Sequence, residues 1–217
     1  MRRWPDVIVG FGHARADGGA LPGCPDGPQV TPGQVARLGR LGFVGLKCIE
    51  KWGREPVDAP AVMPAWRAAA ARGMPIVFHT NKGWDSVCGH GRVAAVARAV
   101  PELPAVALAH AGKEANLPKL YKALADVPNL YIQHMHYRTP AAVRAFKEHG
   151  VARKLVFGTD AQIEPAEILA SADRFVRNMR AAGFTPAEQR HCRVGYAADW
   201  LNEPRLQAPA PSPLRSP

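Results

Sequence analysis

The chain has few of the residues that build disulfide frameworks or membrane spans. Its 217 residues include four cysteines, Cys24, Cys48, Cys88 and Cys192, and no two of them form a C-x-x-C pair. Neither a zinc knuckle nor a disulfide framework is therefore indicated. The sequence has no run of about 18 apolar residues, and Met1–Asp6 lacks the apolar core of a signal peptide. We expect a soluble, cytoplasmic protein with reduced thiols.

The chain also lacks a concentrated basic segment, although its formal net charge is +10. The arginines are dispersed along segments with helical periodicity, without a dense basic run and without interleaved aromatic residues. Such a distribution is typical of solvated helix faces. We therefore expect neither a nucleic-acid partner nor a membrane partner.

What the chain does contain is an alternation of strand-length apolar runs and helix-like segments. Its hydrophobic fraction of 47% is enough to bury one sizeable core. Continuous apolar strands that alternate with helices are typical of a parallel α/β sheet covered on both faces. The expected strands are Val7–Phe11, Phe43–Ile49, Ile76–His79, Val106–Ala109, Leu130–Gln133 and Leu155–Phe157. The expected helices are Gln34–Leu41, Ala61–Arg72, Arg92–Val100, Leu117–Ala125, Ala141–His149, Pro165–Ala182 and Ala187–Leu201.

These elements are expected to form one domain over residues 1–203. The remaining segment, 204–217, is rich in proline and serine and has too little apolar surface to pack, which predicts a disordered tail. Six strand–helix units do not close a standard barrel, which typically takes about 250 residues. Two alternatives remain: an open fragment, or a barrel without its first strands. Because an open edge exposes unpaired main-chain groups, a homodimer is also left open.

Three of the strand-like runs lead into residues that can bind a metal ion or move protons. His79 ends one run, His110 follows the next one, and Asp160 follows the last. The carboxyl ends of parallel strands lie on one face, so residues far apart in sequence can meet there. Imidazole and carboxylate groups bind zinc directly, and a remaining histidine can act as a general base. The ordered series predicts a divalent metal site with a general base.

A further H-x-H pattern, His134-Met-His136, follows another expected strand. In an extended chain both rings point to the same face, which is the geometry of an H-x-H ligand pair. The alternative interpretation is two loop histidines that bond the main chain or a substrate, because such motifs often give false positives. Of the other histidines, His90 could line a substrate loop, although we expect it to be exposed, while His149 and His191 lie at helix ends or faces.

The order of these motifs resembles the amidohydrolase-related (type 2) branch of the amidohydrolase superfamily. The resemblance covers about residues 5–203 and is carried by Gly45–Lys47, Pro75–Thr80, Leu108–Gly112 and Phe157–Ala161. The branch includes metal-dependent hydrolases and the decarboxylases that act on aminocarboxymuconate semialdehyde and hydroxybenzoates. The resemblance implies a TIM-type (β/α) barrel, a divalent metal, with zinc as the expected ion, and a small carbonyl or carboxylate compound as substrate.

The resemblance also implies roles for single residues. His79 matches the metal-binding histidine of the fifth barrel strand. His110 matches the sixth-strand histidine that acts as catalytic acid and base, and Asp160 matches the eighth-strand aspartate that binds the metal or activates its water. Lys47 falls at the fourth strand, where some superfamily members carry a carboxylated lysine that bridges two metals, although a polar or structural lysine is commoner in this branch.

The sequence departs from the family pattern before its first expected strand. The family has a strand there that ends in H-x-H and supplies two metal ligands, whereas here a single histidine, His13, follows Val7–Phe11. Catalytic zinc sites keep about three protein ligands, so His13, His134 and His136 are candidate substrate-binding or auxiliary ligands. We expect weak metal binding and either slow turnover or none, unless a strand ending in H-x-H is restored. The alternative function is a catalytically impaired barrel that acts as a binding or interaction protein.

Overall fold

The computed structural model of the 217-residue chain describes residues 10–16, 29–49, 55–80, 83–110, 117–134, 139–158 and 165–201. The expected tail at 204–217 and the first residues of the expected strand Val7–Phe11 lie outside these ranges. In the part of the chain that is described, no helix is both long enough and apolar enough to cross a membrane. Cys48, Cys88 and Cys192 are buried, reduced thiols.

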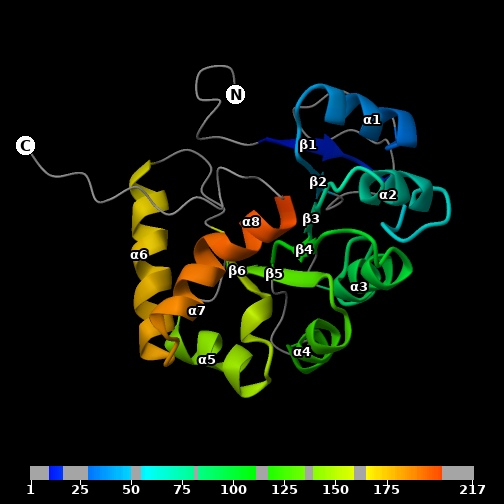
Figure 1. The fold of residues 1–217 in the computed structure, drawn as a ribbon. Coiled ribbons are helices and arrows are strands. Elements are labelled where there is room, and N and C mark those ends of the chain that lie inside the picture. The colour runs from blue at the N-terminus through cyan, green and yellow to red at the C-terminus, as the bar shows by residue number, and fades with distance from the viewer. Residues whose placement is uncertain are drawn as a thin grey trace, which may run out of the picture.

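A six-stranded parallel sheet forms the centre of the fold (Figure 1). Its strands are β1 (Phe11–Ala14), β2 (Gly45–Ile49), β3 (Ile76–His79), β4 (Val106–Leu108), β5 (Leu130–His134) and β6 (Leu155–Phe157). Each strand pairs in parallel with the next one in the chain, so the spatial order follows the sequence order. Parallel neighbours need a crossover connection, which a helix usually supplies. The parallel α/β architecture predicted from the sequence is confirmed.

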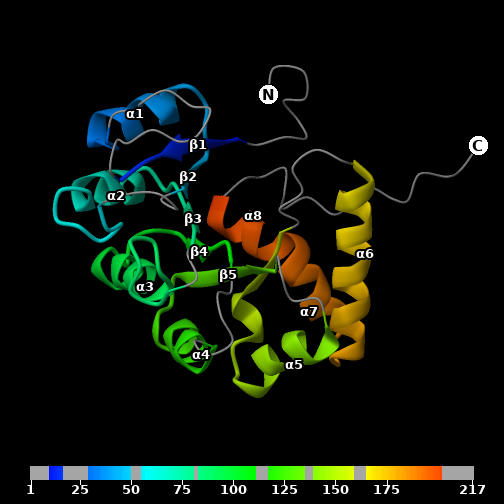
Figure 2. The same cartoon turned by 180° about the vertical axis from the view of Figure 1, so that it is seen from behind.

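The helices that connect successive strands follow one another along one side of the sheet (Figures 1 and 2). They are α1 (Pro32–Arg40), α2 (Met63–Ala70), α3 (His90–Ala99), α4 (Leu117–Asp126) and α5 (Pro140–Glu148). After β6 the chain continues into α6 (Pro165–Ala181), α7 (Pro186–Arg190) and α8 (Tyr196–Leu201). Trp200 of α8 packs on Tyr131 of β5, with ring centroids 4.6 Å apart.

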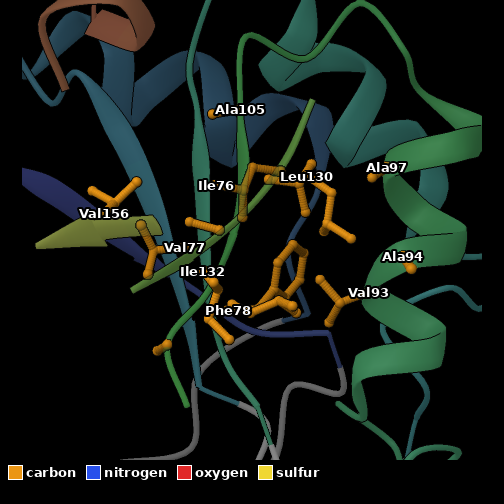
Figure 3. Packing of buried hydrophobic residues seen from close by; sticks show 14 of the residues in the cluster. Ile76, Val77, Phe78, Val93, Ala94, Ala97, Ala105, Leu130, Ile132 and Val156 are labelled. Carbon is orange, nitrogen blue, oxygen red and sulfur yellow. The ribbon is translucent and has the colours of Figure 1, made fainter. Parts of the chain in front are cut away.

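The main core lies between the sheet and the connecting helices. Phe78 of β3 is fully buried, and its ring packs edge to face on Trp66 of α2 with centroids 5.5 Å apart. Figure 3 shows Phe78 on the side of the strand that faces Val93 of α3, while Val77 points away from it. Since successive strand residues point to opposite faces, His79 shares the face of Val77. The same packing that buries Phe78 therefore directs His79 away from the helices.

Local signals explain where several elements begin and end. Thr31 caps α1: its hydroxyl accepts from the N–H of Gln34 at 3.2 Å, while the Gln34 side chain accepts from the N–H of Thr31 at 3.1 Å. Gly73 has a φ of 62°, which L-residues with side chains rarely adopt. It stands between α2 and β3 and lets the chain turn back into the sheet.

Two sequence predictions were wrong at element boundaries. β1 is Phe11–Ala14, so His13 lies within the first strand instead of after it. The expected helix Ala187–Leu201 is divided into α7, a π-helical turn at His191–Gly195, and α8. A side chain on Gly195 would collide with the ring of His191, so glycine permits this wider turn.

Candidate functional site

Two of the predicted site residues meet at the carboxyl edge of the sheet. His79 is the last residue of β3, and His110 follows the end of β4 by two residues. Nδ1 of His79 lies 3.0 Å from Nε2 of His110, and the ring centroids are 4.3 Å apart at an interplanar angle of 73°. At this separation one nitrogen donates its proton and the other accepts it. The two half-buried rings therefore share a hydrogen bond.

The register of β3 and β4 explains this meeting. Phe78 is aligned with Leu108 in the parallel pair, and the N–H of Ala109 donates to the carbonyl of Phe78 at 2.8 Å. The last ladder bond thus lies immediately before both histidines. Their side chains emerge from neighbouring strand ends, although the two residues are separated by 31 positions in the sequence.

The main chain of His110 is held by two further side chains. Oγ1 of Thr80 lies 2.7 Å from the carbonyl oxygen of His110 and 3.2 Å from its main-chain nitrogen. The hydroxyl therefore donates to the carbonyl and accepts from the N–H. Nε2 of His90 lies 2.6 Å from the same carbonyl oxygen. A carbonyl can only accept, so Nε2 of His90 carries a proton.

The prediction that His90 is exposed was wrong. His90 is the first residue of α3, its exposed fraction is 1%, and its ring stacks on Trp84 with centroids 6.3 Å apart. Burial lowers the pKa of His90, and its hydrogen bond to His110 opposes this shift only in part. The neutral ring is therefore favoured. In the described part of the chain Nδ1 of His90 has no hydrogen-bond partner.

Sequence reasoning therefore missed Thr80 and His90. In the sequence, the glycines on either side of His90 suggest a loop. In the structure they are needed for close packing. A side chain at Gly89 would meet the main chain of Gly83 and Trp84, and one at Gly91 would meet the Trp84 ring. Thr80 had a detectable signal, because it directly follows the strand-end residue His79. Its partner, His110, could not be inferred without the register of β3 and β4.

Lys47 and His13 lie on the same face of the sheet as His79 but one layer below it. In the register His13 is aligned with Lys47, and Lys47 is aligned with Val77, whereas His79 is aligned with Ile49. Two residues along a strand correspond to a rise of about 6.6 Å. The structure therefore does not place Lys47 or His13 at the strand-end level of the histidine pair.

His13 belongs to different surroundings. It lines a cavity of about 310 Å³ at the edge of the sheet, together with residues of α1 that include Gln34 and Arg37. Desolvation of its ring and the positive charge of Arg15 lower the pKa of His13. The neutral form, which is the form that binds metals, is thereby favoured.

The other predicted site residues are Asp160, His134 and His136. Asp160 and His136 lie outside the described residues, and His134 is described only as the last residue of β5, where it aligns with Phe157. Among the described residues, no group of three or more histidine, cysteine, aspartate or glutamate side chains could hold a metal ion. The imidazole nitrogens of the described histidines are of a type that binds divalent metals, but by themselves they do not complete the coordination of an ion.

The chain belongs to the amidohydrolase family, because the family model described as Amidohydrolase matches residues 2–201. This match confirms the type 2 branch that the motifs indicated. No protein with a curated description matches the sequence.

Solved structures support the same fold. The 2-pyrone-4,6-dicarboxylic acid hydrolase, described as probable, from Acinetobacter baumannii has a TM-score of 0.62 and 16% identity, with 93% of this chain and 76% of that chain covered. The 5-carboxyvanillate decarboxylase from Novosphingobium aromaticivorans has a TM-score of 0.61 and 16% identity, with 93% and 66% covered. The 2,6-dihydroxybenzoate decarboxylase from Rhizobium has a TM-score of 0.56 and 19% identity, with 79% and 66% covered.

These identities are low enough that the likeness concerns the fold. It confirms the TIM-type (β/α) barrel class that the family resemblance implied. The chain spans about two thirds of the two decarboxylases, at 66% of each, and 76% of the hydrolase.

Proposed function

We propose that this protein is a metal-dependent enzyme that decarboxylates or hydrolyses a small carbonyl or carboxylate compound. The observation that carries the proposal is the hydrogen-bonded pair of His79 and His110 at the carboxyl ends of β3 and β4. In TIM-type barrels this is the end where active sites lie. Family membership and relatives named as decarboxylases and a hydrolase support the same class of reaction.

The proposed role of His79 is to bind a divalent metal. Its Nδ1 is engaged by His110, so Nε2 is the nitrogen that would hold the ion. Asp160 is proposed as the second ligand, with His134 or His136 as auxiliary ligands. Such an ion supplies Lewis acidity toward the carboxylate or carbonyl oxygens of a substrate. Zinc suits imidazole and carboxylate donors, whereas the 5-carboxyvanillate decarboxylase is described with manganese, so both ions enter the test.

The proposed role of His110 is to move a proton. A neutral His79 with its lone pair at Nε2 carries its own proton at Nδ1, so it donates to Nε2 of His110. Nε2 of His110 is then the unprotonated nitrogen of that ring, and when the hydrogen bond to His79 opens, its lone pair can accept a proton. In decarboxylation the C–C bond to the carboxylate would break, CO₂ would leave, and the carbon would keep the electron pair and take the proton that Nε2 of His110 has accepted from water. In hydrolysis Nε2 would take a proton from the attacking water and pass it to the leaving group.

Lys47 is proposed as a polar residue of the substrate pocket. Its place one layer below His79 on the same face of the sheet supports this role. A small anionic substrate at the strand ends would lie above its ammonium group. The alternative function, a binding protein without activity, has less support, because each of the three relatives is named as an enzyme.

The test combines metal titration with a substrate panel. The wild-type chain and the His79→Gln and His110→Gln variants are titrated with Mn²⁺ and Zn²⁺ by calorimetry. They are then assayed with hydroxybenzoates, 5-carboxyvanillate and 2-pyrone-4,6-dicarboxylate, with CO₂ release and ring opening followed separately. We expect H79Q to weaken metal binding at least tenfold. We expect H110Q to retain metal but to lose about 10²–10⁴-fold in kcat.

His149→Gln is the matched control, since His149 directly follows α5 and stacks on Tyr121 with ring centroids 4.2 Å apart, in a different part of the fold. It should leave both metal binding and turnover unchanged. Absence of turnover by the wild-type chain with either metal, or H110Q activity equal to wild type, would contradict the proposal.

A further inference from the structure

We propose that Thr80 and His90 are positioning residues that hold the main chain of His110 and so set the place of its imidazole against His79. The inference rests on the proposed function, because it assigns a purpose to the placement of His110. Neither residue was among the site residues predicted from the sequence, and neither binds the metal or acts on substrate in the proposal above. They act through His110.

The main chain needs these side chains because His110 lies beyond the sheet. β4 ends at Leu108, and the ladder toward β3 ends with the bond from Ala109 to Phe78. The N–H and the carbonyl of His110 are therefore not held by strand pairing with β3. Three hydrogen bonds with Thr80 and His90 satisfy both groups instead: the carbonyl accepts from both side chains at 2.7 and 2.6 Å, and the N–H donates to Oγ1 of Thr80 at 3.2 Å. Thr80 follows β3 and His90 begins α3, so the main chain of His110 is held from two different segments.

Thr80 is well suited to this role because it moves with His79. The two residues are adjacent at the end of β3, and Thr80 is buried, with an exposed fraction of 4%. Its hydroxyl both donates to and accepts from the same residue, His110. The two bonds therefore tie Thr80, directly after β3, to His110, the second residue after β4.

His90 supplies the second fixed point. Its ring is buried at the start of α3 and stacks on Trp84 at an interplanar angle of 22°. A side chain at position 89 would collide with the main chain of Trp84, and one at position 91 would collide with the Trp84 ring. The His90 ring is therefore closely surrounded. A buried nitrogen without a partner destabilises a fold, and Nδ1 of His90 is such an atom within the described residues. Packing alone would favour phenylalanine here, whereas the bond from Nε2 to His110 requires a donor.

The expected consequence is a small displacement of His110 when either support is removed. A displacement of about 1 Å at a catalytic group can reduce turnover about 10²-fold. Thr80→Val keeps the shape of the side chain but removes both of its hydrogen bonds. His90→Phe keeps a buried ring but removes the Nε2 donor. Thr80→Ser and His90→Gln retain a hydroxyl and an N–H donor, respectively, and serve as the conservative variants.

The control variant is Asn129→Leu. Asn129 is buried and donates to the carbonyls of Val100 and Leu103 at 3.2 and 3.4 Å, next to the amino end of β5. Its loss removes two buried hydrogen bonds at the other end of the sheet, so N129L reports what a loss of stability does by itself.

Three measurements are made on the full chain and these five variants. Crystal structures give the distance from Nδ1 of His79 to Nε2 of His110. Amide exchange followed by NMR gives the protection of the His110 N–H. Steady-state kinetics with Mn²⁺ separate kcat from KM.

In T80V and H90F we expect the distance between these two nitrogens to exceed hydrogen-bond range. In T80V we also expect at least fivefold faster amide exchange at His110. We expect kcat at least tenfold lower in both, with KM near the wild-type value. T80S and H90Q should recover most of the change, and N129L should show none of it.

An unchanged pair geometry and unchanged kcat in both T80V and H90F would overturn the inference. If N129L lowered kcat to the same extent, stability alone would explain the loss and the inference would also fail. If the wild-type chain turned over no substrate, the proposed function would fail, while the two structural measurements would still decide whether Thr80 and His90 position His110.

Discussion

Nδ1 of His79 and Nε2 of His110 are 3.0 Å apart, although 31 positions separate them in the sequence. The contact follows from the parallel register in which Phe78 aligns with Leu108, because each histidine comes shortly after one of these aligned residues. Any change that shifts β3 relative to β4, or that displaces the chain after β4, therefore acts on both rings at once. The predictions below address the packing, the loop and the titrating groups around this contact.

Replacement of Phe78 by alanine should strongly destabilise the fold. Phe78 is fully buried and its ring contacts Trp66 at a centroid distance of 5.5 Å. Removal of a buried phenylalanine side chain leaves a cavity and costs about 3–5 kcal/mol. Urea denaturation measures the free energy of unfolding. Leu41→Ala, at a side chain that is 59% exposed, is the control and should change it by less than about 0.5 kcal/mol. Equal effects of the two variants would contradict the packing described above.

Replacement of Gly89 by alanine should disturb the loop that carries His90. A methyl group there would meet the main-chain oxygens of Gly83 and Trp84, which cannot yield as a flexible side chain can. We expect a loss of stability of about 1–3 kcal/mol, typical of overpacking, together with reduced metal-dependent turnover.

Gly33→Ala provides the control for Gly89→Ala. Its added methyl group would come no closer than 3.7 Å to Oγ1 of Thr31, and Gly33 is an exposed position of α1. Thermal unfolding of both variants tests the comparison. An alanine at position 89 that leaves both the unfolding temperature and turnover unchanged would show that the loop is not constrained as described.

The stability of the fold should decrease as the pH falls below about 6.5. Burial lowers the pKa of His90 in the folded state from its ordinary value of 6.5, so the unfolded chain binds a proton more readily than the folded chain does. The free energy of unfolding therefore falls as pH decreases through the unfolded pKa of this group. Urea denaturation at pH 7.5 and pH 5.5 measures the slope. His90→Gln should flatten it, and an unchanged slope in H90Q would assign the effect to other groups.

Cys192 should be unreactive in the folded protein. Burial is the main cause that raises the pKa of its thiol to about 12, and Glu188 adds to the shift. The thiolate is the reactive form, so almost none of it is present at pH 8. We expect iodoacetamide to leave Cys192 unmodified in the native chain and to alkylate it in urea, as measured by peptide mass spectrometry. Rapid alkylation in the native state would contradict its burial near Ala152.

Much of the fold could be predicted because its signals are local. The strands Ile76–His79 and Leu155–Phe157 match their predicted bounds, since a strand covered on both faces is a continuous apolar run. Helix bounds agree to within about two residues for most helices, as expected for periodic patterns with frayed ends. The first strand was misplaced: the apolar run Val7–Phe11 overlaps β1 only at Phe11, and an edge strand carries polar residues such as His13.

The candidate site was predictable only in part. The strand-end positions of His79 and His110 follow from the apolar runs that precede them, and their meeting follows from a parallel sheet. Asp160 and His136 lie outside the described residues, so their roles stay predictions. His90 was expected to be exposed, because glycine neighbours and a polar ring indicate a loop in any reading that uses sequence alone.

By itself the sequence determined the class of the fold, the order of its elements and the residues that stand at the strand ends, because apolar periodicity and helix caps depend on neighbouring residues. Only the tertiary structure decided which side chains hold those residues in place. The contacts from Thr80 and His90 to the main chain of His110 join segments 20 and 30 positions apart. They depend on strand register and on the packing of Trp84 against α3, and these long-range relations leave no periodic pattern in the chain.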